Sequence, residues 1–179
     1  MIYMFLADGF EEVEALCPLD LMRRAGLEVK TVGVGSSQIT GSHSITVTAD
    51  MTDADYADEA PTLVFLPGGM PGTLNLDASR TVHRAIEAAV REGGYLAAIC
   101  AAPSILGKKG LLAGKRAVCY PGFEEALTGA TVTALHVVKD GKILTAAGMG
   151  AALSFGLAIV AELCGAEKAQ ALRTAVIAD

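Results

Sequence analysis

The strongest structural signal in this chain is the stretch from 95 to 104, which reads Tyr95-Leu96-Ala97-Ala98-Ile99-Cys100-Ala101-Ala102-Pro103-Ser104. An apolar run ends abruptly at a thiol, and small residues with a proline follow at once. This order is typical of a buried strand that turns into a helix, because the first helical turn does not need the donor that proline lacks. Free N–H groups at a helix N-terminus favour a thiolate, so we expect Cys100 to be a reactive nucleophile rather than an inert core thiol.

The rest of the chain alternates short apolar runs with amphipathic stretches, which is the pattern of parallel strand–helix units. Strands are predicted at 2–7, 27–34, 45–48, 62–66, 95–99, 116–119, 131–138 and 142–146, with a turn-rich excursion at 35–44. Helices are predicted at 11–25, 80–92, 101–109, 151–164 and 166–175. No linker or repeat interrupts the 179 residues. We therefore predict one doubly wound α/β domain that spans residues 1–179.

Composition and charge exclude several classes of protein. The net charge is −6, and no basic stripe with interleaved aromatics is visible, which argues against nucleic acid as the main partner. No apolar segment approaches the roughly 20 residues of a membrane span, and the first residues lack a signal-peptide pattern. Four scattered cysteines and three histidines predict neither a disulfide framework nor a metal site. We expect a cytoplasmic protein with reduced thiols, no membrane association and no cofactor.

Three segments are predicted to meet beyond the carboxyl ends of the strands, where open α/β sheets place their reactive groups. They are residues 8–14, the loop 67–72 and Cys100. On a helical wheel Glu14 shares a face with Phe10, Cys17 and Leu21, whereas Glu11 and Glu12 point elsewhere. Burial would raise the pKa of Glu14 and fit it for acid–base work; the alternative is a helix-start glutamate favoured by the dipole.

The loop Pro67-Gly68-Gly69-Met70-Pro71-Gly72 is no phosphate loop, because no Lys-Ser/Thr follows it. It is either an ordinary tight turn or, with the amide of Ala101, an oxyanion hole beside the thiol. A histidine base for Cys100 is not evident. His83 is expected to face solvent from a helix, and His136 to be structural in a strand; the position of His43 is not fixed by the sequence.

Four segments together resemble the DJ-1/ThiJ/PfpI superfamily over essentially the whole chain, in order. They are Ala7-Asp8-Gly9-Phe10-Glu11-Glu12-Val13-Glu14, Leu66-Pro67-Gly68-Gly69, Ala97-Ala98-Ile99-Cys100-Ala101-Ala102-Pro103, and Asp140 to Thr145 running into Gly148-Met149-Gly150. The resemblance implies a flavodoxin-like α/β/α sandwich and a homodimer. It implies that Cys100 is the nucleophilic, oxidation-sensitive cysteine and Glu14 the acid that hydrogen-bonds it. Further implied roles are oxyanion-hole amides at Gly69 and Ala101, and dimer-interface positions at Glu11, Arg24 and His43.

One segment departs from the family pattern. Many members carry a histidine before a proline in the region that here reads Val118-Cys119-Tyr120-Pro121-Gly122, so Tyr120 stands in its place. A phenol with a pKa near 10 is a poor base at neutral pH, although it can shape the pocket or donate a hydrogen bond. Cys119 is either a core cysteine or a second thiol near Cys100.

The leading functional hypothesis is a cofactor-independent glyoxalase or protein deglycase that acts on methylglyoxal-type α-oxoaldehydes or their adducts through Cys100 and Glu14. The alternative is a redox sensor or stress-protective chaperone, active in oxidative stress towards glycated or oxidised targets, in which Cys100 is oxidised to the sulfinate. A PfpI-type intracellular peptidase is a weaker alternative, because those peptidases tend to place a histidine where Ala101 stands.

Overall fold

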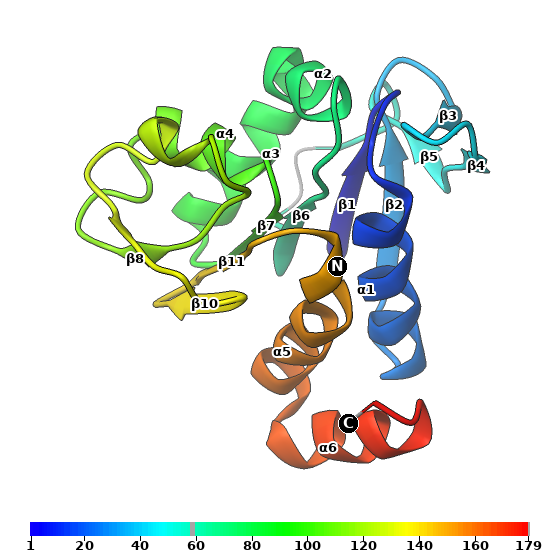
Figure 1. The fold of residues 1–179 in the computed structure, drawn as a ribbon. Coiled ribbons are helices and arrows are strands. Elements are labelled where there is room, and N and C mark those ends of the chain that lie inside the picture. The colour runs from blue at the N-terminus through cyan, green and yellow to red at the C-terminus, as the bar shows by residue number, and fades with distance from the viewer. Residues whose placement is uncertain (58–59, 179) are drawn as a thin grey trace.

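The computed structural model describes residues 1–57 and 60–178, and its centre is a seven-stranded sheet (Figure 1). The strand order is β10-β11-β7-β6-β1-β2-β5. Neighbouring strands run parallel, except that β10 pairs antiparallel with β11 at one edge. The strands are β1 (Ile2–Leu6), β2 (Val29–Gly33), β5 (Met51–Thr52), β6 (Leu63–Leu66), β7 (Tyr95–Ile99), β10 (Val137–Asp140) and β11 (Ile143–Ala146).

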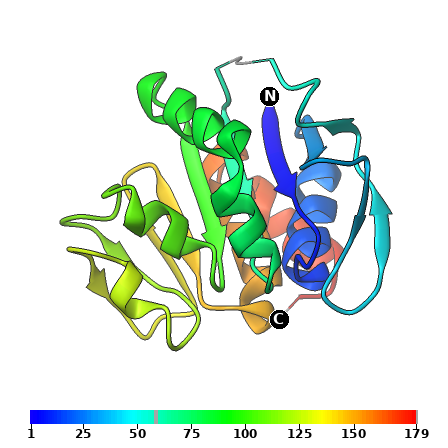
Figure 2. The same cartoon turned by 90° about the horizontal axis from the view of Figure 1, so that it is seen from above.

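Helices cover both faces of this sheet (Figure 2). One face packs against α1 (Glu12–Arg24) and α5 (Ala152–Cys164), and α6 (Ala166–Ala175) packs against α5. The other face packs against α2 (Gly72–Ala78), α3 (Arg80–Arg91) and α4 (Pro103–Lys108). Side chains of each central strand alternate between the two cores, as in β1, where Met4 enters the first core and Phe5 the second. The predicted single-domain, flavodoxin-like α/β/α sandwich is confirmed.

Several elements differ from the sequence prediction. The short helix α2 was not predicted, because its first residue is a glycine and no side chain caps it. The predicted strand 131–138 is two strands, β9 (Thr131–Val132) and β10. β9 pairs with β8 (Arg116–Ala117) in a separate small sheet. In the predicted excursion, β3 (Gln38–Thr40) forms a hairpin with β4 (Thr46–Thr48). The remaining short elements are η1 (Glu124–Ala126) and η2 (Met149–Ala151).

The sheet topology brings the predicted site segments together. From β1 the chain continues to β2 on one side, whereas β6 pairs with β1 on the other side. Such a change of direction opens a crevice at the carboxyl ends of the strands. The segment after β1, the loop after β6 and Cys100 after β7 all lie at this end. In the described part of the chain, none of the helices is both long and apolar enough to cross a membrane.

Candidate active site

Cys100 occupies a strained corner between β7 and the turn that leads into α4. Its φ of 64° lies in the left-handed region, which non-glycine residues rarely adopt. Its N–H donates to the carbonyl of Ala146 at 2.9 Å, and its carbonyl accepts the N–H of Tyr120 at 2.8 Å. The backbone is therefore fixed from two neighbouring segments, and the half-buried thiol is held in one place. The predicted strand–helix corner is confirmed.

Glu14 lies in the first turn of α1, with only 1% of its surface exposed. Its carboxyl group hydrogen-bonds the thiol of Cys100, and its Oε2 accepts the N–H of Gly68 at 3.1 Å. Burial raises the pKa of Glu14 to about 7, and the negative charge of Glu11 acts in the same direction; the hydrogen bonds from Cys100 and Gly68 oppose the rise. A protonated fraction of Glu14 therefore persists at neutral pH, as the helical-wheel argument predicted.

The prediction that Cys100 is a thiolate with a low pKa is wrong for the resting site. Burial first, and then the charge and hydrogen bond of the Glu14 carboxylate, raise the pKa of Cys100 to about 12; the amides of Gly69 and Ala101 favour the thiolate but are outweighed. The helix N-terminus favours the thiolate, but the carboxylate that faces the sulfur acts in the opposite direction. Above about pH 7 the negative charge thus rests on Glu14 while sulfur keeps its proton.

The loop after β6 closes over this pair because Gly68 and Gly69 carry no side chain. A Cβ atom at Gly68 would overlap Glu14 Oε2 and lie 2.6 Å from the Cβ of Cys100. Gly69 has a φ of 92°, and a Cβ there would overlap the backbone nitrogen of Glu11. Only bare backbone fits at these two positions. The amides of Gly69 and Ala101 both reach the sulfur. The structure assembles the groups of the predicted oxyanion hole.

Comparison with known proteins agrees with this geometry. The sequence profile of the DJ-1/PfpI family matches residues 1–162. The chain belongs to the DJ-1/PfpI family. Among DJ-1/PfpI relatives, protein dj-1beta of Drosophila melanogaster is 36% identical over 170 residues, which cover 93% of this chain and 91% of that protein. The Parkinson disease protein 7 homolog of Danio rerio is 34% identical over 179 residues, or 97% of this chain and 95% of that one.

Two further DJ-1/PfpI proteins bear on chemistry. The glutathione-independent glyoxalase DJR-1.2 of Caenorhabditis elegans is 29% identical over 164 residues, 90% of this chain and 87% of that protein. A solved structure described as "Toxoplasma gondii DJ-1, oxidized" superposes with a TM-score of 0.94 at 29% identity and covers 98% of this chain and 97% of that one. The crystal structure of Drosophila DJ-1beta superposes equally well, at 33% identity, over 99% of this chain and 97% of that one.

Among the described residues of this DJ-1/PfpI protein, the groups that act on the Cys100 thiol are Glu14 and the amides of Gly69 and Ala101, and no histidine is among them. Tyr120 is 51% exposed at the rim, and a Cβ at Gly148 would lie 3.3 Å from its ring and 3.9 Å from Glu14 Oε1. His83 is half-buried, not solvent-facing, because its Nε2 lies 2.7 Å from the carbonyl of Asp77. His136 is exposed in a bend before β10, so its predicted place in a strand is also wrong.

Cys119 does not join the site. It is buried in the core on the α3–α4 face of the sheet, whereas Cys100 packs against the core on the α1–α5 face. Burial and then Glu124 raise the pKa of Cys119 to about 11. This arrangement favours the core-cysteine interpretation over that of a second reacting thiol.

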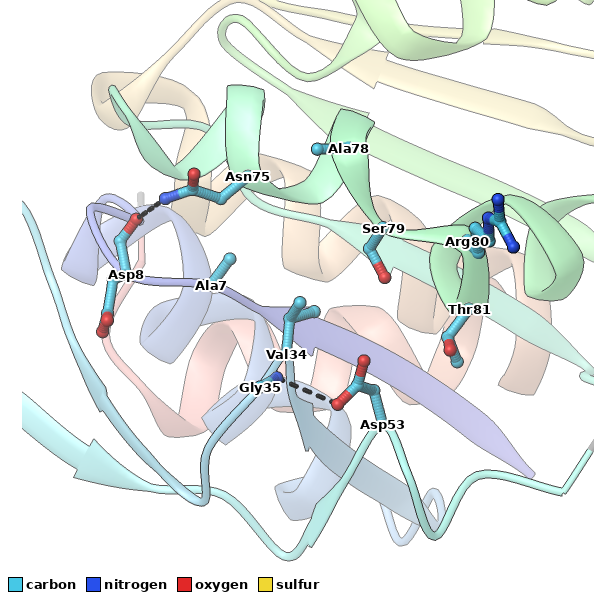
Figure 3. Close-up of a pocket in the computed structure, with 10 residues that line it drawn as sticks. All are labelled: Ala7, Asp8, Val34, Gly35, Asp53, Asn75, Ala78, Ser79, Arg80 and Thr81. Carbon is cyan, nitrogen blue, oxygen red and sulfur yellow. Dashed lines mark hydrogen bonds between the residues drawn. The ribbon is translucent and has the colours of Figure 1, made fainter.

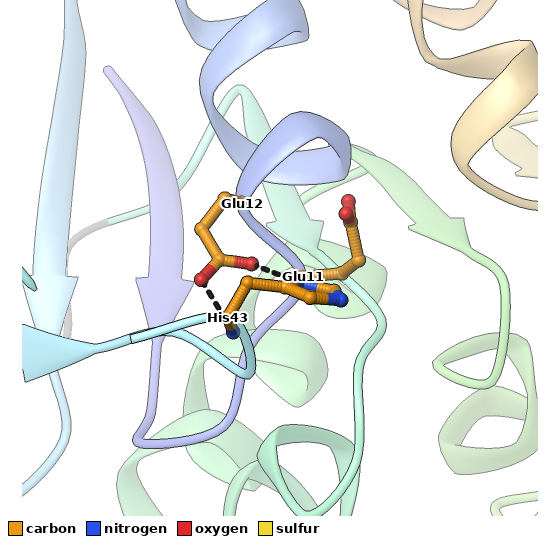
Figure 4. A group of neighbouring side chains, drawn as sticks. All are labelled: Glu11, Glu12 and His43. Carbon is orange, nitrogen blue, oxygen red and sulfur yellow. Dashed lines mark hydrogen bonds and ion pairs between the residues drawn. The ribbon is translucent and has the colours of Figure 1, made fainter. Parts of the chain in front are cut away.

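Within one chain, the three residues predicted for a dimer interface have three different bonding partners. Arg24 is exposed and pairs with Asp20 at 2.6 Å, while Glu11 caps α1. His43 bonds Glu12, which is only 4% exposed although the sequence analysis placed it off the apolar face (Figure 4). Glu12 accepts the His43 N–H at 2.7 Å and lies 2.9 Å from its ring Nδ1. A role for these residues in a dimer interface stays a prediction.

The burial of Glu12 was not predicted, because its partner His43 is distant in the sequence. Burial opposes the charge of Glu12, but the bonds from His43 outweigh it, so the pKa of Glu12 lies below its ordinary value. The pKa of His43 is raised, first by its hydrogen bond to Glu12.

By residue type, Glu11, Glu12 and His43 could hold a metal ion, since their ligand atoms lie within 4.8 Å of one another. Their polar atoms are instead engaged with each other and with the start of α1.

A cavity of about 520 Å³ opens at the ends of β1 and β2, on the α2–α3 side of the sheet (Figure 3). It is lined by Asp8, Asp53, Asn75, the start of α3 and neighbouring small residues. Neither Cys100 nor Glu14 contributes to its walls. The cavity is therefore separate from the reacting pair, and the candidate active site is the pair with its two amides.

Proposed function

We propose that this protein is a cofactor-independent glyoxalase or deglycase that acts on methylglyoxal-type α-oxoaldehydes or their adducts. The observation that supports this most strongly is the hydrogen bond between the thiol of Cys100 and a buried Glu14 whose pKa is about 7. A group with such a pKa can accept and return a proton at neutral pH. The similarity to a nematode protein named as a glutathione-independent glyoxalase supports the same reaction.

The first step forms a carbon–sulfur bond. Sulfur attacks the aldehyde carbon while the Glu14 carboxylate takes the thiol proton, and the carbonyl electron pair moves onto oxygen. The amides of Gly69 and Ala101, which face the sulfur in the resting site, would stabilise this oxyanion. Glu14 then returns the proton to the oxygen and leaves a neutral hemithioacetal. No oxidant is required, and Tyr120 does not take part in the proton transfer.

The second half of the reaction moves hydrogen between two carbons. Glu14, again a carboxylate, removes the proton from the former aldehyde carbon, and the electron pair shifts onto the oxygen of the neighbouring ketone to give an enediolate. Glu14 delivers this proton to the neighbouring carbon, and the hydroxyl proton of the hemithioacetal passes to the former ketone oxygen, which yields a thioester of a 2-hydroxy acid. Water hydrolyses the thioester and restores the thiol. The net reaction adds one water to methylglyoxal to give lactate.

Lactate formation from methylglyoxal tests this proposal. Because Glu14 must be ionised to accept the proton and its pKa is about 7, kcat/KM is expected to rise about tenfold between pH 6 and pH 8. Cys100→Ala should abolish lactate formation, whereas Cys164→Ala, which removes an exposed thiol, should leave it unchanged. Wild-type protein that consumes no more methylglyoxal than Cys100→Ala would refute the activity.

A redox-sensing or stress-protective role is the second candidate, favoured by the two amides and the protonated acid around one half-buried sulfur. Two equivalents of peroxide would convert the thiol to the sulfinic acid and release two waters, and Glu14 would hold the product. Mass spectrometry after mild peroxide should then find two oxygens on Cys100. Oxygen on Cys164 alone would eliminate this role.

We further propose a cytoplasmic homodimer as the working form.

A further inference from the structure

We propose that Glu11 is a positioning residue for the reacting pair: its N-cap side chain holds the backbone of Glu14, and its backbone N–H holds the Gly68 loop against the Glu14 carboxyl group. The inference rests on the proposed roles of Cys100 and Glu14. It assigns Glu11 a task inside the site of its own chain, independent of any role between subunits.

The side chain of Glu11 begins the helix that carries Glu14. Glu11 is the N-cap of α1, with extended backbone (φ −87°, ψ 123°), and its Oε2 accepts the N–H of Glu14 at 2.7 Å. An N-cap side chain satisfies a donor that the first helical turn leaves unpaired. Here that donor belongs to the reacting acid itself, so the cap fixes the backbone from which the carboxyl group extends.

The backbone of Glu11 holds the loop on the other side of that carboxyl group. Its N–H donates to the carbonyl of Gly68 at 2.9 Å, while the N–H of Gly68 donates to Glu14 Oε2 at 3.1 Å. The three residues thus form a closed ring of three hydrogen bonds. Displacing Glu11 would open two of the three bonds.

The charge of Glu11 acts on a carboxyl group that has few other charged neighbours. Cys100 faces Glu14 from the end of β7, and the uncharged amide of Gly68 faces it from the loop after β6. Glu11 is the negative group that raises the pKa of Glu14, after burial. Glu11 itself faces Glu12 and His43, which are bonded to each other.

The proton that Cys100 and Glu14 share gives the alkylation of Cys100 a distinctive pH profile, because only the thiolate reacts. While Glu14 is protonated, the thiolate population grows about tenfold per pH unit. Once Glu14 is ionised, forming the thiolate only moves the proton from sulfur to Glu14, so the rate levels off. The break in the profile therefore reports the pKa of Glu14, which burial raises to about 7.

Variants of Glu11 should move this break. With iodoacetamide as the probe and the Cys100 peptide followed by mass spectrometry, Glu11→Gln and Glu11→Ser are expected to lower it by about half a pH unit. Both lack the charge, and serine is a favoured N-cap. Glu11→Asp keeps charge and cap and should leave the break in place. Asp20→Asn, which removes a charge from the exposed surface of the same helix, should also leave the break in place.

The outcomes separate this inference from the proposed function. A break that stays at the wild-type pH in the charge-free variants overturns the role of Glu11 alone. A wild-type profile with no break near pH 7 overturns the pairing of Cys100 with Glu14, and with it the proposed function. If Glu11→Gln does not fold by circular dichroism, Glu11→Ser decides the comparison.

Discussion

Glu14→Gln is expected to lower kcat/KM for methylglyoxal by about 100- to 10,000-fold, the range lost when a positioned general base is removed. Glutamine has the same shape and can still accept the N–H of Gly68, so the fold should persist. It cannot take the proton of Cys100 or return it to carbon. The measurement is lactate formation at pH 8 with a circular dichroism spectrum of the variant. A variant within tenfold of wild type would exclude Glu14 as the proton carrier.

The same variant should change how stability depends on pH. The pKa of Glu14 in the folded protein is about 7, above its ordinary value of 4.5, so the folded state favours the protonated form. The stability that this gives is complete below pH 4.5 and is lost as the pH rises through 7. The total is on the order of 3 kcal/mol. When urea denaturation is measured at pH 5 and pH 8, the unfolding free energy of Glu14→Gln should fall less from the lower to the higher pH than that of wild type. Equal losses would contradict the raised pKa of Glu14.

Gly68→Ala is expected to lower kcat/KM at least about 100-fold, since a displacement of 1 Å in a reacting group can cost that much. The added methyl would overlap the Glu14 carboxyl group and press on the Cβ of Cys100. The backbone of Gly68 does not need the left-handed region, so alanine strains the contacts rather than the loop. Overpacking of this kind costs about 1–3 kcal/mol of unfolding free energy.

Gly150→Ala is the matched control for that prediction. Gly150 lies in the neighbouring η2 turn, and a Cβ there would meet no atom within 4 Å. Its kcat/KM should match wild type. If both variants lose activity equally, or if Gly68→Ala retains it, the close approach of the loop to the pair does not matter for function.

The features that sequence reasoning found have local causes. The apolar run that stops at Cys100 marks the end of a buried strand, and the seven-residue spacing from Glu14 to Leu21 places the acid on the buried face of α1. The alternation of strands and helices was enough to predict the sandwich. Boundaries failed where local signals are weak, as in the uncapped α2 and in the strand that splits into β9 and β10.

The features that sequence reasoning missed depend on partners distant in the chain. The thiol pKa was predicted in the wrong direction because the Glu14 carboxylate, far from Cys100 in sequence, outweighs the local amides. Burial of Glu12 depends on His43, which lies in a hairpin that periodicity did not resolve. The sequence offered one signal: Gly41, where any side chain would overlap the Glu12 carboxyl group.

The central claim is that Cys100 and Glu14 share one proton, and the pH profile of Cys100 alkylation tests it most directly. For wild type, the rate should rise about tenfold per pH unit and level off near pH 7, where Glu14 ionises. For Glu14→Gln, the rate should pass through pH 7 without a break. A wild-type rate that climbs unbroken through pH 9, as in the variant, would contradict the shared proton.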